Sequence, residues 1–158
     1  MSQYLRVAQH FSRAITKSFI KKRVISGSMM ELAALIELCV KHGIQYEIHD
    51  GFYIMGGKYA CRHVWITVEG QILDPGKDVI NIIMPRTRQL NLAYSDTLPS
   101  GVKQVDNETT EERERLHDVE IGIKNLRIST DKYWSDTPGN PKIKNMGRRL
   151  VSKIVSKL

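Results

Sequence analysis

Residues 63–75, which read HVWITVEGQILDP, predict two antiparallel strands joined by a tight turn at Glu69-Gly70. β-Branched and aromatic residues favour strands, and glycine favours the turn. Around this turn, residues that face each other have numbers that sum to 139. Trp65 therefore lies opposite Asp74, and opposed side chains point to the same face of a sheet.

The same register brings a histidine and an acid together. His63 is two residues from Trp65 and shares its face, because side chains alternate along a strand. His63 and Asp74 are then diagonal neighbours, about 5–7 Å apart at Cβ. A carboxylate there accepts a hydrogen bond from one imidazole nitrogen and fixes the tautomer of the other. We therefore expect a His63–Asp74 pair.

Upstream residues extend this hairpin to a three-stranded antiparallel meander. The strands are expected at 44–55, 58–69 and 71–74. Asp50-Gly51 predicts a break or a bulge in the first strand, and Gly56-Gly57 turns the chain into the second. The third strand is expected to end at Pro75-Gly76.

Two helices are predicted before this sheet. Residues 3–22 have an apolar stripe that begins at Tyr4, with basic residues elsewhere on the helix. The segment Ser26-Gly27-Ser28 breaks the pattern and offers N-cap chemistry to a second helix over 29–41, which ends before Gly43. Apolar residues nearly encircle this second helix, so we expect it to be buried against the sheet.

The pattern weakens after the sheet. Residues 79–84 are an apolar run typical of either a strand or a helical turn. A charged helix is expected over 111–126, a loop over 129–141 and a basic amphipathic helix over 142–158. The chain thus reads as a single α+β domain (1–158) with the following parts: an N-terminal helix at 1–24, a core at 25–76, an extension at 77–128, and a loop with a basic helix at 129–158.

The charge is concentrated at the two ends. Of 24 basic residues, twelve lie within 1–24 and 142–158, and these two stretches contain no acid. The remaining middle has 12 basic and 17 acidic side chains. A basic amphipathic helix either contacts nucleic acid or an anionic membrane, or docks its apolar stripe on the same domain with its charges in solvent. The residues expected to make it are Lys142, Lys144, Arg148, Arg149, Lys153 and Lys157.

Composition excludes several other classes of protein. No apolar run is long enough to cross a bilayer, and the charged N-terminus lacks the apolar region of a secretory signal. Two cysteines are too few for a disulfide scaffold and favour a reducing, cytoplasmic location. The sets Cys61/His63/Asp74 and His49/Asp50 lack the spacing of a zinc ribbon or an HExxH helix, so no metal site is predicted.

Ser28 lies at the predicted start of the buried helix. Amide groups at a helix start are unpaired, and the helix dipole there favours negative charge. A thiol at such a position is activated, and its neighbouring amides can hold an oxyanion. The alternative role of Ser28 is that of an ordinary N-cap residue.

Part of the sequence resembles the core of the transglutaminase-like branch of the papain-like cysteine peptidase superfamily. The motifs that carry this resemblance are Gly27-Ser28, Gly43-Ile44 and the stretch 63–75. In that group a Cys begins the buried helix, and an HxW…DP pair of strands completes a Cys-His-Asp triad. The resemblance covers residues 26–76 and implies a papain/transglutaminase-like core. By position, Ser28 takes the place of the nucleophile, His63 that of the base and Asp74 that of the orienting acid, with Gly27 and Trp65 in support.

The resemblance implies cleavage or transfer of a peptide or isopeptide amide acyl group, without a cofactor. Serine at position 28 departs from the pattern, because a hydroxyl is a much poorer nucleophile than a thiolate. Three explanations remain open: a deliberate Cys-to-Ser replacement, a degenerate relative that binds without catalysis, and a true serine nucleophile. Two alternative functions also remain, a non-catalytic binding or structural module with a basic tail, and an acyltransferase of the arylamine N-acetyltransferase type.

Overall fold

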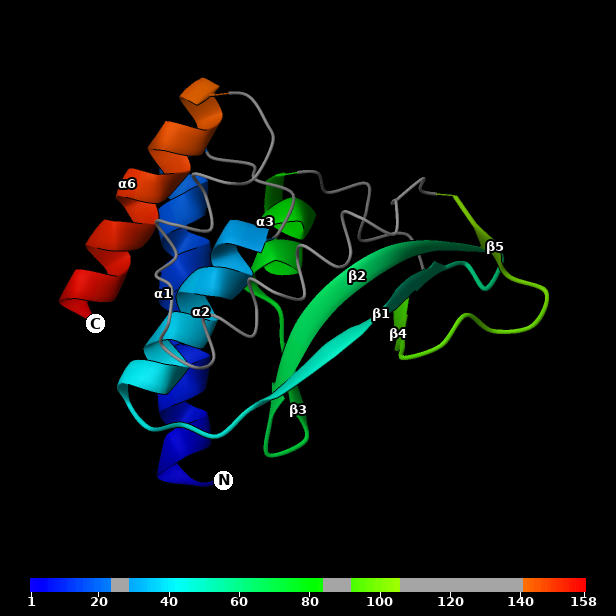
Figure 1. Cartoon of the computed structure of the whole chain (residues 1–158), viewed down its shortest axis with the longest axis horizontal. Coiled ribbons are helices and arrows are strands. Elements are labelled where there is room, and N and C mark those ends of the chain that lie inside the picture. The colour runs from blue at the N-terminus through cyan, green and yellow to red at the C-terminus, as the bar shows by residue number, and fades with distance from the viewer. Residues whose placement is uncertain (24–28, 84–91, 106–140) are drawn as a thin grey trace.

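The computed structural model describes residues 1–23, 29–83, 92–105 and 141–158 (Figure 1). Gly27, Ser28, the helix expected at 111–126 and nearly all of the loop expected at 129–141 lie outside these residues. The described part is a mixed α+β structure in which helices pack against one side of an antiparallel sheet. None of the described helices is both long and apolar enough to cross a lipid bilayer.

Both N-terminal helices have the predicted bounds. Helix α1 (Gln3–Lys22) begins at an N-cap, where the Ser2 hydroxyl accepts a hydrogen bond from the Leu5 amide at 3.1 Å. Its buried stripe starts at Leu5 rather than at Tyr4, which is 59% exposed. Helix α2 (Met29–Lys41) supplies the largest share of the core because apolar residues cover nearly its whole circumference.

The predicted meander exists within a larger sheet. Its strands are β1 (Glu47–Met55), β2 (Tyr59–Val68) and β3 (Gln71–Leu73), with β4 (Leu92–Ser95) and β5 (Lys103–Gln104) in addition. The order is β3-β2-β1-β4, and β5 pairs in parallel with β2. Val68 faces Gln71 and Ile66 faces Leu73, so the predicted register of this hairpin is confirmed. The sequence did not predict β4 or β5.

The bulge expected at Asp50-Gly51 is wrong. β1 and β2 pair without interruption, and Gly51 lies directly opposite His63. A side chain at position 51 would collide with the Ser95 carbonyl oxygen and approach the Trp65 ring to 2.8 Å. Glycine is therefore needed here because β4 and the Trp65 ring come close to the backbone, and the strand itself remains regular.

The third strand runs directly into a helix. Helix α3 (Pro75–Ile83) starts at Pro75. Proline has no backbone N–H, but the N–H at the first position of a helix has no intrahelical acceptor, so no hydrogen bond is lost. Asp74 is its N-cap, because its Oδ1 atom accepts a hydrogen bond from the Lys77 amide at 3.2 Å. The apolar run 79–84 is thus mainly the end of a helix, and Pro75-Gly76 begins this helix rather than a loop.

The last helix packs back onto the first two. Helix α6 (Pro141–Lys157) runs antiparallel to α1 and beside it (Figure 1), and it also contacts α2. Leu150, Val151 and Ile154 are buried in the common core. The final carbonyls of α6 accept hydrogen bonds from Lys41 (to Val155, 3.0 Å) and His42 (to Leu158, 2.7 Å). The Lys41 cation at the end of α2 therefore stabilises the negative end of the α6 dipole.

The two faces of β2 have different surroundings. Val64, Ile66 and Val68 point into the core that the helices share. Side chains alternate along a strand, so His63 and Trp65 point from the opposite face. The helices thus cover one face, and the polar and aromatic residues occupy the other.

We expect Gly51→Ala to lower the free energy of unfolding by about 3 kcal/mol, because the clash is with backbone and a buried ring rather than with a flexible side chain. Gly56 has a positive φ of 59° and open space around it, so Gly56→Asn should cost less than about 1 kcal/mol. Urea unfolding of both variants measures the difference. Equal stability of the two variants would contradict the close packing at Gly51.

Candidate functional site

His63 and Asp74 form a direct hydrogen bond. The Nε2 atom of His63 lies 2.6 Å from Oδ2 of Asp74, and both side chains are buried, with 8% and 3% of their surface exposed. The predicted proximity of this pair is confirmed. The hairpin register brings them together, because His63 comes from β2 and Asp74 directly follows β3.

The carboxylate of Asp74 has two further partners. The hydroxyls of Tyr53 on β1 and Tyr94 on β4 each donate to Oδ2 at 2.9 Å. Together with the Lys77 amide on Oδ1, these bonds give Asp74 four donors from β1, β2, β4 and α3. Sequence reasoning missed both tyrosines. The alternation along the predicted first strand contained a signal for Tyr53, but nothing local points to Tyr94.

These contacts require a strongly curled sheet. Asp74 lies at the end of β3 and Tyr94 in β4, and in the strand order these are three strand spacings apart. In a flat sheet this is about 14 Å, farther than a tyrosine side chain reaches. The hydroxyl nevertheless contacts the carboxylate, so the face that bears His63 is concave.

The environment of Asp74 favours its charged form. Burial by itself would raise the pKa of this carboxyl, but the hydrogen bond and charge of His63, with the bonds from Tyr53 and Tyr94, lower it below its ordinary value. Burial, followed by the negative charge of Asp74, raises the pKa of both tyrosines, which therefore stay protonated as donors. Asp74 is thus a buried anion held by neutral hydroxyls and one imidazole.

The tautomer of His63 follows from this bond. A carboxylate only accepts, so Nε2 carries a proton, and in the neutral ring the lone pair is on Nδ1. Among the described residues, no side chain or backbone group bonds to Nδ1. The ring stacks on Tyr53 with centroids 4.0 Å apart, and Trp65 lies beyond it at 6.1 Å. An imidazole fixed in this way, with its lone pair unused and an anion behind it, has the arrangement of a general base.

A second histidine–carboxylate pair lies on the same face. Nδ1 of His49 is 2.9 Å from Oδ1 of Asp96, and its Nε2 is 3.0 Å from the Thr67 hydroxyl. The His49 ring stacks on Trp65 with centroids 5.3 Å apart, so Trp65 lies between the two histidines. Both nitrogens of His49 are occupied, and Asp96 is largely exposed. The sequence did not predict this pair.

The side chains of His49 and Asp50, the pair considered as metal ligands, do not lie on the same face of β1. Adjacent residues in a strand point to opposite faces, and Asp50 forms an ion pair with Arg62 at 3.0 Å. Within the described ranges, no three His, Cys, Asp or Glu side chains converge where a metal ion would fit. Cys61 is partly buried and lies on the same face as His63, opposite Tyr53.

Helix α2 begins at Met29, the residue that follows Ser28 in the sequence. This is the helix start that the sequence predicted. Ser28 and Gly27 themselves lie outside the described residues. Trp65 is 3% exposed and is thus buried. A nucleophile would have to reach Nδ1 of His63 from the concave face, since the other face of β2 is filled by the helical core.

Asp74→Asn keeps a good N-cap for α3 but removes the charge, and we expect a loss of about 1–3 kcal/mol in unfolding free energy at pH 7. The pKa of Asp74 is lower in the folded state than its unfolded value of 3.8. The charged carboxylate therefore stabilises the folded state fully at pH values above 3.8. It disappears as the pH falls through the folded pKa, so the two proteins should converge in acid. Urea unfolding between pH 3 and pH 7 measures this.

Asp96→Asn is the matched control for that experiment, since Asp96 also bonds a histidine but is 70% exposed at its side chain. It should change the pH dependence of stability little. A gap between Asp74→Asn and the parent chain that stays constant down to pH 3 would contradict the buried-anion assignment.

Comparison with known proteins identifies no relative. No protein-family model matches this chain, and neither a curated protein nor a solved structure is significantly similar to it. The resemblance to the transglutaminase-like branch is therefore neither supported nor contradicted from that side. A functional proposal for this chain therefore rests on the chemistry of the His63–Asp74 pair.

Proposed function

We propose that this protein belongs to the transglutaminase-like branch of the papain-like superfamily and that its core serves amide acyl chemistry on a peptide or isopeptide. The observation that carries this proposal is the buried His63–Asp74 hydrogen bond of 2.6 Å, which leaves Nδ1 as the proton acceptor. The expected hairpin register also supports it.

In the proposed reaction, Nδ1 of His63 accepts the proton of the side chain at position 28, which attacks the amide carbonyl carbon. Asp74 stabilises the resulting imidazolium and keeps its ring in place through the bond to Nε2. The unpaired amides at the start of α2 donate to the carbonyl oxygen as it becomes negative. His63 then returns the proton to the leaving amine, and a second nucleophile, water or another amine, releases the acyl group.

The residue at position 28 sets how much activity to expect. A serine hydroxyl needs a fully effective base, whereas a thiol at a helix start is already partly ionised near neutral pH. We infer that the chain as written is a weak or inactive form of a cysteine enzyme. In this proposal the protein acts in the cytoplasm, where its two cysteines stay reduced.

A non-catalytic binding module is the second candidate. The stacking of Tyr53 on His63 and the three donors that share one oxygen of Asp74 favour it, because a fully satisfied polar network can serve to fix a fold. In that case the concave face holds a ligand or a partner, and His63 is a structural residue. The two candidates differ in whether position 28 interacts with His63.

Ser28→Cys tests this difference through the rate of alkylation by iodoacetamide, measured across pH. We expect the pKa of the introduced thiol to lie well below the ordinary value of about 8.5, because His63 and the start of α2 stabilise the thiolate. Adding His63→Ala should return the reactivity to that of an exposed thiol. Adding Asp74→Asn, which preserves the helix cap, should produce an intermediate effect.

His49→Ala in the Ser28→Cys background is the matched control, since it removes a second imidazole bonded to an acid from the same face. It should leave the thiol pKa unchanged. A thiol at position 28 that titrates near 8.5 and is indifferent to His63→Ala would favour the binding module. Cys61→Ser in every variant keeps the signal specific to position 28.

A further inference from the structure

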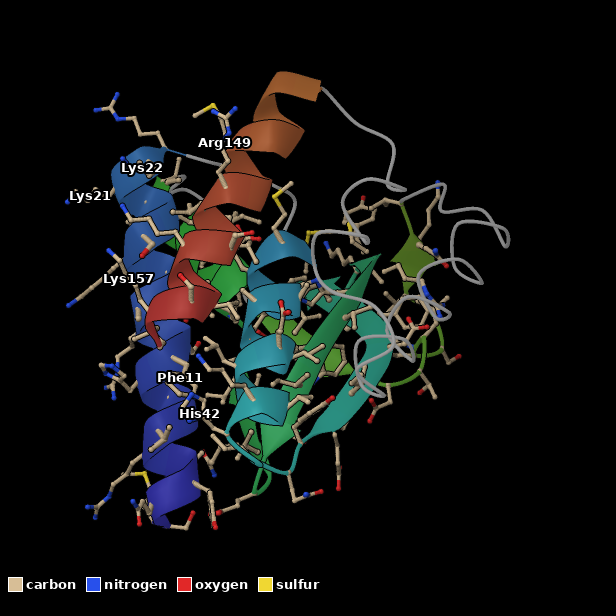
Figure 2. All side chains as sticks on the ribbon, turned by 60° about the vertical axis from the view of Figure 1, so that its left-hand side comes forward. Phe11, Lys21, Lys22, His42, Arg149 and Lys157 are labelled. Carbon is tan, nitrogen blue, oxygen red and sulfur yellow. The ribbon has the colours of Figure 1, made fainter. Side chains whose placement is uncertain are left out.

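The two basic ends of the chain meet in space. Helices α1 and α6 are separated by more than a hundred residues in sequence, yet they lie side by side and antiparallel (Figures 1 and 2). Each belongs to a stretch that contains six basic residues and no acid. The fold therefore brings eleven of the 24 basic residues onto two neighbouring helices.

A groove runs between these helices, with a volume of about 240 Å³. Lysines from both helices line it: Lys21 and Lys22 from α1, and Lys153 and Lys157 from α6. Its other lining residues are Ser18, Leu150 and Ile154. In Figure 2 the labelled side chains of Lys21, Lys22 and Lys157 lie along this side of the molecule, with Arg149 above them on α6. We call this feature the α1/α6 groove.

The lysines of the α1/α6 groove are not neutralised by the protein. All four are exposed, and within the described part of the chain no acidic side chain forms an ion pair with any of them. Like charges that converge on one groove repel each other and create a positive potential there. A ligand with several negative charges at fixed spacing would relieve this repulsion.

The apolar side of α6 argues against a membrane as the ligand. Leu150, Val151 and Ile154 are buried in the core, so these apolar residues of α6 do not face a lipid bilayer, and among the described side chains of the helix Met146 is the large apolar one that is exposed. The residues that line the groove include no aromatic ring on which an unpaired base would stack, and the hydroxyl of Ser18 already donates to the Ala14 carbonyl at 2.9 Å. What remains is a double row of point charges, which fits a phosphate backbone.

We propose that the α1/α6 groove binds the phosphodiester backbone of a nucleic acid duplex without reading its sequence. The groove is formed by the helices, whereas His63 points from the face of the sheet that the helices do not cover. Binding there leaves the concave face open. Nucleic acid binding at this groove is therefore independent of the acyl chemistry. The sequence predicted contact through the C-terminal helix alone, and the groove adds the lysines of α1.

Fluorescence anisotropy with a labelled 30-base-pair DNA of arbitrary sequence tests the proposal. With four lysines on phosphates, the logarithm of affinity should fall linearly with the logarithm of salt concentration, with a slope of about −3.6. Affinity should then drop by about two orders of magnitude between 50 and 200 mM salt. A second duplex of different sequence should bind equally well.

The double variant Lys21→Gln with Lys153→Gln removes one charge from each wall of the groove and should reduce the magnitude of the slope by about 2. The matched control is Lys58→Gln with Lys103→Gln, which removes the same charge at the far end of the sheet near β5 (Figure 1) and should leave the slope unchanged. Circular dichroism checks that both double variants are folded.

Two further pairs separate the groove from the C-terminal helix. Lys21→Gln with Lys22→Gln and Lys153→Gln with Lys157→Gln should each weaken DNA binding to a similar degree. A loss only from the α6 pair would overturn the groove, as would an equal loss in the control or no binding at 50 mM salt. Tighter binding to phosphatidylserine vesicles than to DNA, lost in the Lys21/Lys153 variant, would reassign the surface to a membrane.

Discussion

The buried carboxylate of Asp74 is the constraint on which the arrangement of the sheet depends. A charge removed from water is strongly unfavourable unless hydrogen bonds replace its hydration. Asp74 obtains these bonds from β1, β2 and β4 and from the first turn of α3. Because these donors belong to elements that would lie far apart in a flat sheet, their convergence requires the curl that makes one face concave.

The two faces of this curled sheet have different roles. The face covered by helices is apolar and supplies the core, whereas the concave face holds two histidine–carboxylate pairs on either side of Trp65. Gly51 lets Trp65 lie close to the backbone, so the indole screens His63 from water on one side while Tyr53 stacks on the other. The same packing that orients the imidazole also lowers the pKa of its acidic partner, because all three donors to Oδ2 favour the charged form.

On the helical side, the packing of α6 on α1 gathers positive charge into one groove.

Local patterns explain which parts of the fold could be predicted. The bounds of α1 and α2 follow from helical periodicity and caps, and the β2–β3 register follows from a two-residue turn, because each depends on residues close in sequence. The bulge at Asp50-Gly51 was a wrong interpretation, since a glycine needed for a close tertiary approach resembles one needed for a kink. Similarly, Pro75 is compatible with both a strand end and a helix start, and the Asp74 cap decides between them.

The sequence by itself determined that a histidine and an acid would meet, because a tight hairpin fixes the neighbours of every residue within it. It also determined that both ends of the chain are basic and contain no acid. Only the tertiary structure decided that Tyr53 and Tyr94 join Asp74, that Asp96 joins His49, and that the basic ends lie together. These contacts depend on sheet curvature and on the packing of distant helices, which many residues set jointly and no short stretch encodes.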